Sequence, residues 1–343
     1  MVKNQVLIEI KATAVNVDDV ALLQDAGGGG WFFHARTPTP AAPLVGGMEY
    51  AGVVLSVGPS VQHLAPGDRV LGLQDVAFQK MPGTWAERTV APEPDVVKFP
   101  PPPPGAPELT FAQAAATAMA AFVSGDMYER SLPTLAKASS PRVVVVGASG
   151  GLGSVLVQLL AANASGGRTG RPHITAVCGT TNVDRMRRLG ADEVVDYTKG
   201  SFGAAVAAGS VDVVFDFRGG REAERDGRKV LRRGGTFITA VGPMSGVGDR
   251  VLTCGEWHSW ACGLTCNLCI GACPCSRHGY QMGGGLPPLS AAVFNRVVVD
   301  ANVRGEVGLE LPFTEASVRE GVGKVASRHA GGKVVFNMEM ARE

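Results

Sequence analysis

The segment from Val143 to Leu160, VVVVGASGGLGSVLVQLL, constrains the fold of this chain more than any other stretch. It reads as a buried strand, a turn of small residues and a helix with one apolar face. The first N–H groups of such a helix have no partners within the helix, and the positive end of the helix dipole lies there, so a phosphate can bind. We therefore predict a dinucleotide site, with a purely structural glycine turn as the alternative. The predicted contacts are Ala148, Ser149, Gly150, Gly151 and Leu152.

The sequence on either side of this segment predicts an α/β fold with two domains. From Arg142 to about Gly242, continuous apolar strands alternate with amphipathic helices, a pattern typical of a parallel sheet that is buried on both faces. Up to about Val90 the chain reads instead as short strands broken by glycine and proline. A proline tract at 100–104 reads as an extended connector, or alternatively as a ligand for a proline-recognising partner.

Charge and hydropathy narrow the class of ligand. The 32 Lys and Arg against 31 Asp and Glu leave a formal net charge of +1, so we expect a small-molecule substrate and no nucleic acid. No uncharged apolar run approaches the length of an integral membrane segment. The first 20 residues show no targeting pattern, and seven cysteines make no secreted disulfide framework. We expect a cytoplasmic location, with an organelle, chloroplast or mitochondrion, as the alternative.

The end of the next predicted strand bears on the choice of cofactor. An NAD-preferring site places Asp or Glu there, whereas this strand ends in Cys178, Gly179, Thr180 and Thr181. Hydroxyl groups of Thr180 and Thr181 could bind a 2′-phosphate, with charge from Arg171 or Arg185, so we predict NADPH. The alternative is that Thr180 caps the helix that starts near Asn182.

Several motifs recur in an order that resembles the medium-chain dehydrogenase/reductase superfamily. They are AVNVDDV, PLVGGMEYAGVV, APGDRVLGL, GTWAERTV, GASGGLG, AVCGTTNVDRMRRLGADEVVDY and RHAGGKVVF. The chain is most similar to the zinc-independent quinone oxidoreductase branch, in the group of reticulon-interacting and chloroplast quinone oxidoreductase homologues. This resemblance implies a GroES-like catalytic domain at 1–120 and 280–343, and a Rossmann NADP-binding domain, a doubly wound parallel sheet, at 121–279. It also implies substrate in the cleft between them, a homodimer, and hydride transfer from NADPH to quinones or α,β-unsaturated carbonyls.

The same resemblance suggests roles for individual residues. Zinc-dependent relatives carry a His where this chain has Met48, and a Cys near the position of Asn16 and Asp18, so we expect no catalytic zinc. Asn16 matches a residue near the nicotinamide and is the predicted catalytic residue; an Asn that ends a strand is the alternative. Tyr197 matches a position at the adenosine end, or is a sheet-edge aromatic. Val241 and Gly242 complete the predicted cofactor contacts.

Two departures from the family pattern leave a second function open. Val123 stands where a Thr is expected, and the hairpin that family members place before QVLIEIKA is missing. Thr181 stands where an Arg is usual, which argues against NADPH. Six cysteines crowd between Cys254 and Cys275, and the spacing of the central ones fits one helix face. We expect thiols packed on an apolar helix, with paired zinc ligands or oxidised or lipid-bearing thiols as alternatives. The second function is a non-catalytic NADPH-binding protein with a redox- or metal-responsive cysteine cluster.

Overall fold

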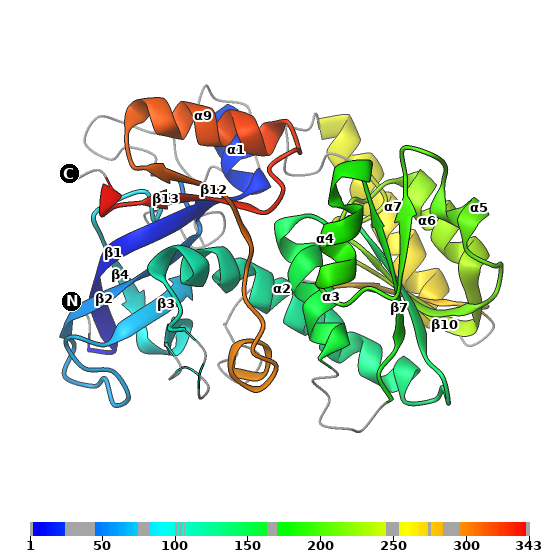
Figure 1. Ribbon diagram of the computed structural model, residues 1–343, viewed down its shortest axis with the longest axis horizontal. Helices are drawn as coiled ribbons and strands as arrows, with labels where there is room; N and C mark the ends of the chain where they lie inside the picture. The colour runs from blue at the N-terminus through cyan, green and yellow to red at the C-terminus, as the bar shows by residue number, and fades with distance from the viewer. Residues whose placement is uncertain are drawn as a thin grey trace. The chain divides into compact units, whose positions relative to one another are not determined.

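The computed structural model describes residues 3–24, 45–74, 83–99, 102, 105, 107–162, 170–244, 254–273, 276–283 and 295–340. These residues form two compact units, which we describe one at a time (Figure 1). The first contains the described residues of Met1–Phe122 and Leu286–Glu343, and the second those of Val123–Val247 and Leu252–Gly285. The domain boundaries predicted from the sequence stay predictions. Most of the proline tract lies outside the described residues.

The first unit is built on a mainly antiparallel sheet. Its strands run in the order β12-β13-β1-β2-β3-β5, and β4 also pairs with β1. Every pair is antiparallel except β12 with β13. The strands are β1 (Gln5–Val15), β2 (Glu49–Val57), β3 (Arg69–Leu73), β4 (Arg88–Pro92), β5 (Val96–Lys98), β12 (Val307–Pro312) and β13 (Lys333–Asn337). Its other elements are α1 (Val17–Gln24), α9 (Glu315–Ala326), the single turns at Glu93–Asp95 and Asn295–Asp300, and the first half of α2 (Phe111–Leu135).

Alternation of apolar residues along β1 sets the core of this sheet. Val6, Ile8 and Ile10 are fully buried, because successive side chains of a strand point to opposite faces. They pack with Tyr50 and other buried side chains from β2, β3 and β4. This is the GroES-like β domain that the resemblance implied.

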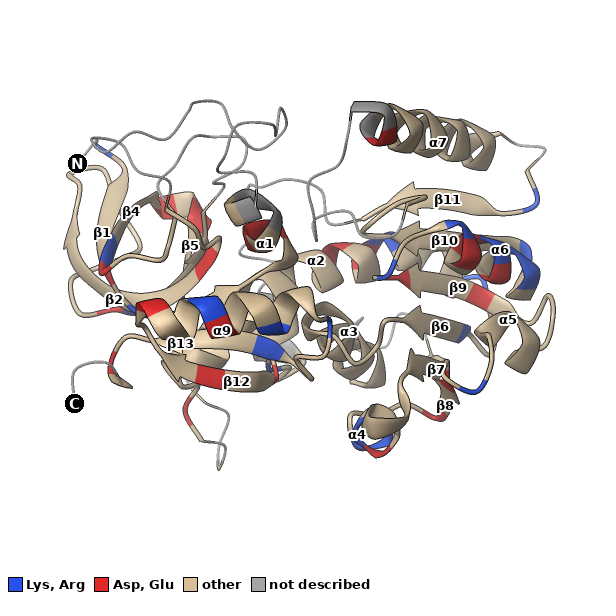
Figure 2. Ribbon diagram, turned by 90° about the horizontal axis from the view of Figure 1, so that it is seen from above, with Lys and Arg blue, Asp and Glu red and all other residues tan. Residues whose placement is uncertain are grey.

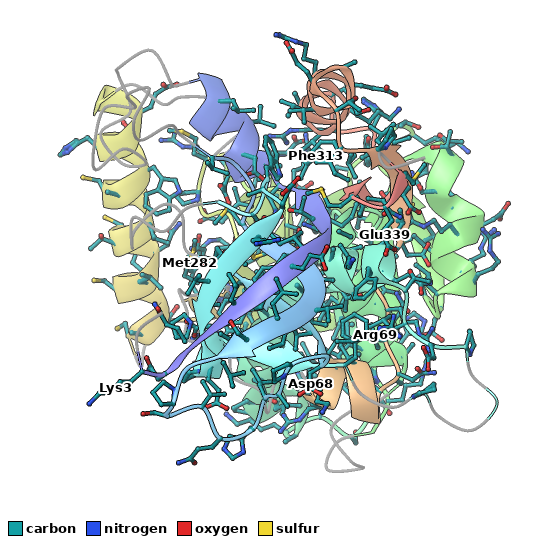
Figure 3. All side chains as sticks on the ribbon, turned by 90° about the vertical axis from the view of Figure 1, so that its left-hand side faces the viewer. Lys3, Asp68, Arg69, Met282, Phe313 and Glu339 are labelled. Carbon is teal, nitrogen blue, oxygen red and sulfur yellow. The ribbon has the colours of Figure 1, made fainter. Side chains whose placement is uncertain are left out.

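Helix α9 covers a second cluster on the same unit. Thr314 caps the helix by accepting a hydrogen bond from the Ser317 N–H. Phe336 of β13 stacks at an angle against Phe313, with 5.7 Å between ring centroids, and Gly321 gives α9 room to approach the Phe336 ring. Figure 3 shows Phe313 next to α9 and Arg69 at the start of β3.

The second unit is a parallel sheet with helices around it. Its six strands run in the order β11-β10-β9-β6-β7-β8, and every pair is parallel. Read from the other edge this is the order 3-2-1-4-5-6 of a dinucleotide-binding fold, which confirms the predicted doubly wound Rossmann architecture. The strands are β6 (Arg142–Val146), β7 (His173–Cys178), β8 (Glu193–Asp196), β9 (Val211–Asp216), β10 (Leu231–Thr239) and β11 (Gly279–Met282). The helices are the second half of α2, α3 (Gly151–Ala161), η2 (Thr180–Asn182), α4 (Val183–Arg188), α5 (Phe202–Ala205), α6 (Arg221–Val230) and α7 (Cys254–Ala272).

The central strands of this sheet are buried on both faces, as their unbroken apolar sequence predicts. Val143 to Val146 are at most 3% exposed, and all of β9 is buried. Strand order reverses between β6 and β9, and ligands of such sheets bind where the carboxyl ends of the strands meet at that point. Within the described part of the chain, no helix has the length and apolarity that crossing a bilayer requires.

Candidate functional site

The glycine turn follows β6 directly and begins α3, as the sequence predicts. Gly147 adopts a left-handed conformation with φ of 76°, and Gly150 is the residue before the helix. A Cβ atom on Gly153 would lie 2.3 Å from the Gly147 carbonyl oxygen, so Gly153 lets the helix pack on the turn. A Cβ atom on Gly150 would lie 3.4 Å from that oxygen, its nearest neighbour, which leaves the outer side of the turn open. The turn therefore has room for a ligand at Gly150.

The two ends of the turn differ in what they contact. Ala148 is fully buried, and its N–H donates to the Val177 carbonyl of β7, so Ala148 anchors the turn to the sheet. Ser149, Gly151 and Leu152 are half-buried and Gly150 is exposed. No side chain caps α3 at Gly150, so the first N–H groups of the helix have no capping partner.

A carboxylate lies at the carboxyl end of β7, and it comes from the neighbouring strand. The Thr180 hydroxyl donates to Asp196 at the end of β8 over 2.6 Å, and the Thr198 hydroxyl donates to its other oxygen over 2.7 Å. These hydrogen bonds lower the pKa of Asp196, so the group is ionised at neutral pH. The sequence argument considered only residues 178–181 and missed this acid, because parallel strands bring their carboxyl ends to one edge.

Tyr197 lies over the same edge. Its N–H donates to the Cys178 carbonyl, and its hydroxyl oxygen lies 3.3 Å from where a Cβ atom on Gly179 would be. Half of the side chain is exposed, at 52%. The structure thus brings Tyr197, Gly179 and Thr180 together at one edge, next to the exposed Thr181.

Of the two arginines considered for phosphate binding, the structure places one at this edge. Arg185 donates to the Ser149 carbonyl over 3.2 Å, which joins α4 to the glycine turn. Arg171 instead makes two hydrogen bonds to Asp192 and one to the Gly190 carbonyl. It precedes the first residue of β7 and so lies at the amino end of the sheet. The suggestion that Arg171 adds charge to the cofactor site is therefore wrong.

The carboxyl ends of β9 and β10 complete this edge around Asp216. Its carboxylate accepts hydrogen bonds from the backbone N–H groups of Arg218 and Gly219 and from the Thr239 hydroxyl. Burial raises the pKa of Asp216, and these bonds oppose the shift. Thr239 in turn accepts from the backbone N–H groups of Val241 and Gly242. Asp216 and Thr239 were not predicted, although a polar residue that ends an apolar strand is a usable signal.

A second polar cluster is buried in the first unit around Lys333. The Lys333 ammonium donates to the Asn16 side-chain carbonyl and to the Glu49 carboxylate. The Asn16 amide donates to the same carboxylate oxygen over 2.9 Å, and the other oxygen of Glu49 accepts from the Met119 N–H over 2.8 Å. Asp19 accepts from the Asn16 N–H over 2.8 Å. Asn16, the predicted catalytic residue, is thus fixed at both ends of its amide.

The Lys333 ammonium lies close enough to several carboxyl groups of this cluster to affect them. Burial raises the pKa of Asp19 to about 7, although hydrogen bonds from Asn16 and Gly47 and the charge of Lys333 oppose the shift. Burial also raises the pKa of the neighbouring Asp18. Among the described residues, no group of three or more His, Cys, Asp and Glu side chains could hold a metal ion. Lys333, Glu49 and Asp19 were missed because they lie far apart in sequence and match no local motif.

Two further predictions concern α2 and α7. Val123 is buried, and the next residue, Ser124, donates to the Leu152 carbonyl, which fixes α2 to the first turn of α3. On α7, Cys262, Cys266 and Cys269 are free and exposed, so the expectation that these thiols pack against the protein is wrong. Cys273 is disulfide-bonded, and Cys275 lies outside the described residues.

Two family models match the chain. The model of the alcohol dehydrogenase GroES-like domain matches residues 2–101, and the model of the zinc-binding dehydrogenase matches residues 189–263. The first lies in the first unit described above, and the second begins directly after α4 and extends into α7.

Curated relatives and solved structures agree with these matches. The chain is 29% identical to the mitochondrial NAD(P)H oxidoreductase RTN4IP1 of Mus musculus, over 98% of this chain and 82% of that protein. It is 32% identical to the 2-methylene-furan-3-one reductase of Solanum lycopersicum, over 72% of this chain and 58% of that protein. The quinone oxidoreductase of Coxiella burnetii shares the fold, with a TM-score of 0.66 at 21% identity, over 98% of this chain and 91% of that one.

Proposed function

Because this chain belongs to the medium-chain dehydrogenase/reductase superfamily, and resembles its zinc-independent quinone oxidoreductase branch, we propose that it is an NADPH-dependent reductase of quinones or α,β-unsaturated carbonyls. One observation carries the proposal. The open glycine turn after β6 lies at the strand-order reversal, and Arg185 joins it to α4 through the Ser149 carbonyl.

The proposed cofactor site follows the carboxyl edge of the sheet. The pyrophosphate would bind the N–H groups of Ser149, Gly151 and Leu152, because the Gly150 N–H already donates to the Gly147 carbonyl. Gly150 leaves room for the ligand to approach the turn closely. The adenosine end would lie between Tyr197 and the Thr180–Thr181 pair. Val241 and Gly242 would line the remainder, held in place by Thr239. Bound NADPH supplies the hydride; the chain binds and orients it.

The preference for NADPH rests on Arg185 and Thr181. The Thr180 hydroxyl already donates to Asp196, so it cannot also donate to a 2′-phosphate. Thr181 is exposed at the same edge, and the Arg185 guanidinium lies at the turn itself. Asp196 opposes this preference, because its ionised carboxylate repels a phosphate.

We base the proposed substrate class on the substrates that the relatives' names describe. The tomato relative reduces an enone, a relative of Aspergillus terreus is a trans-enoyl reductase, and the Coxiella structure is a quinone oxidoreductase. All three names describe an electron-poor double bond conjugated to a carbonyl. We propose that Asn16 places the substrate or the nicotinamide: Glu49 takes one amide N–H, which leaves the second for a ligand.

The test is cofactor titration by fluorescence, followed by turnover with a quinone and with a short enal. We expect tighter binding of NADPH than of NADH, and oxidation of NADPH by one of the two acceptors. Ser149→Asp places a negative charge at the phosphate position and should abolish both NADPH binding and turnover. Ser201→Asp, at a turn before α5, is the matched control. Absence of NADPH binding to the wild type would overturn the proposal.

A second function is favoured by the three exposed thiols of α7. A protein that binds NADPH without turnover of either acceptor would be the non-catalytic, cysteine-responsive protein instead. The relatives named mitochondrial favour the organellar alternative for location, which cell fractionation would test. The homodimer also stays a proposal.

A further inference from the structure

Helix α7 presents two faces of different character. Its inner face is used for packing: Trp260 donates to the Val241 carbonyl over 3.0 Å, and Asn267 donates to Glu224 over 2.8 Å. Leu264 packs against the core, and Gly271 lies against the backbone of β11. These positions recur at intervals of three and four residues, so residues about two positions further along the helix face the opposite way.

The opposite face carries His258 and the free thiols Cys262, Cys266 and Cys269, all of them exposed. Glu256 is the single charged residue of the helix sequence, and Figure 2 shows no basic residue on α7, in contrast to α6 beside the same sheet. The thiols therefore have no lysine or arginine of their own helix nearby.

One of these thiols differs from the other two. The Cys262 Sγ atom lies 3.5 Å from Nε2 of His258, one helical turn before it. Within the described part of the chain, neither Cys266 nor Cys269 has such a partner. An imidazole in contact with a thiol is the arrangement that converts a weak nucleophile into a strong one, because the base takes the proton as sulfur attacks.

We propose that Cys262 and His258 form a site for covalent addition of soft α,β-unsaturated carbonyl electrophiles. Sulfur forms a bond to the β-carbon of the acceptor while the thiol proton passes to His258. The electron pair of the carbon–carbon double bond moves toward the carbonyl, and the proton then returns from His258 to the α-carbon. The product is a thioether, and no oxidant or reductant takes part.

This inference deepens the proposed function, because the electrophiles are the same class of molecule as the proposed substrates. The protein would carry, on a helix whose inner face contacts the Val241 carbonyl, a thiol that records exposure to its own substrate class. Addition to Cys262 needs no cofactor, so the site and the reductase activity can be tested separately.

The chain contains its own controls. Cys266 and Cys269 match Cys262 in exposure and lack the histidine, and Cys178 is buried at the end of β7, where burial raises the pKa of its thiol to about 11. Chymotrypsin cuts after Trp260, Leu264 and Leu268, so the three thiols of α7 fall in separate peptides. Labelling can therefore be measured thiol by thiol in the full chain.

The experiment is alkylation by acrylamide in the absence of NADPH, with the peptides quantified by mass spectrometry. We expect Cys262 to react about tenfold faster than Cys266 and Cys269, and Cys178 to react slowest. His258→Gln should lower the rate at Cys262 to that of Cys266. Cys262→His places an imidazole one turn before Cys266 and should raise the rate there. Equal rates at the three exposed thiols, or a rate at Cys262 that His258→Gln leaves unchanged, would overturn the proposal.

All of these substitutions are at exposed positions, and thermal unfolding would confirm that they leave the fold intact. Absence of NADPH turnover, together with fast alkylation of Cys262, would contradict the proposed function and leave the thiol site standing. Slow labelling of Cys262 together with NADPH turnover would contradict the thiol site and leave the proposed function standing.

Discussion

The glycine turn of the second unit and the Lys333 cluster of the first unit use charge in opposite ways. At the carboxyl edge of the second unit, backbone N–H groups of the glycine turn offer partial positive charge at an open surface. In the first unit, the charges of Lys333 and Glu49 are buried against each other, and burial raises the pKa of nearby Asp19. A site made of backbone dipoles is prepared for an anionic ligand, whereas a buried ion network holds its own side chains in place. The comparison teaches that the glycine turn of the second unit should govern cofactor binding. The buried network of the first unit should govern stability and the placement of Asn16.

The largest effect should come from Lys333→Met. This change removes the one cation of the buried cluster and leaves the Glu49 carboxylate unpaired, at an expected loss of about 3–5 kcal/mol in the free energy of unfolding. Lys333→Met combined with Glu49→Gln should recover most of that loss. Urea denaturation measures both, with the exposed Lys324→Met as control. A loss no larger than that of the control would show that the ion pair contributes little.

The pH dependence of stability should report Asp19. Its pKa is raised from 3.8 in the unfolded chain to about 7 in the folded protein, so the folded state holds the proton more tightly. The stability from this group is therefore complete below about pH 4 and is lost as the pH rises through 7, by up to about 4 kcal/mol. Asp19→Asn should reduce the difference between the unfolding free energies at pH 5 and at pH 8. The same pH slope in wild type and variant would contradict the assignment.

Two glycines of one turn should separate packing from binding. Gly153→Ala forces a methyl group against the Gly147 carbonyl and should cost about 1–3 kcal/mol in unfolding free energy. Gly150→Ala has room in the free protein and should leave stability unchanged, yet it fills the space where the pyrophosphate would lie. Urea denaturation and NADPH titration of both variants measure the two effects. Equal NADPH affinity in Gly150→Ala and wild type would place the phosphate elsewhere.

The smallest effect should come from Asp196→Asn. Removing this ionised carboxylate beside Thr180 should raise the affinity for NADPH relative to NADH by up to about fivefold. Asp184→Asn, on the exposed side of α4, is the matched control. Titration of both cofactors measures the ratio, and a ratio that falls in Asp196→Asn would mean that Asp196 does not face the 2′-phosphate.

The same comparison explains what the sequence could predict. The glycine turn, the parallel sheet and the alternation in β1 are local patterns, so Ser149, Gly150 and the buried Ile8 follow from neighbouring residues alone. Contacts of Lys333 with Asn16, and of Asp196 with Thr180, join residues from separate strands, which no local pattern reveals. The exposed thiols were missed because apolar composition does not say which helix face packs.

The central claim is that cofactor binding belongs to the second unit and that Asn16 acts on the reaction. The most direct measurement is the NADPH dissociation constant of Asn16→Ala and of Gly150→Ala, with turnover measured in the same samples. We predict that Asn16→Ala binds NADPH like the wild type and turns it over more slowly, while Gly150→Ala loses binding by tenfold or more, which corresponds to about 1.4 kcal/mol. Loss of binding in Asn16→Ala, with unchanged binding in Gly150→Ala, would contradict the account.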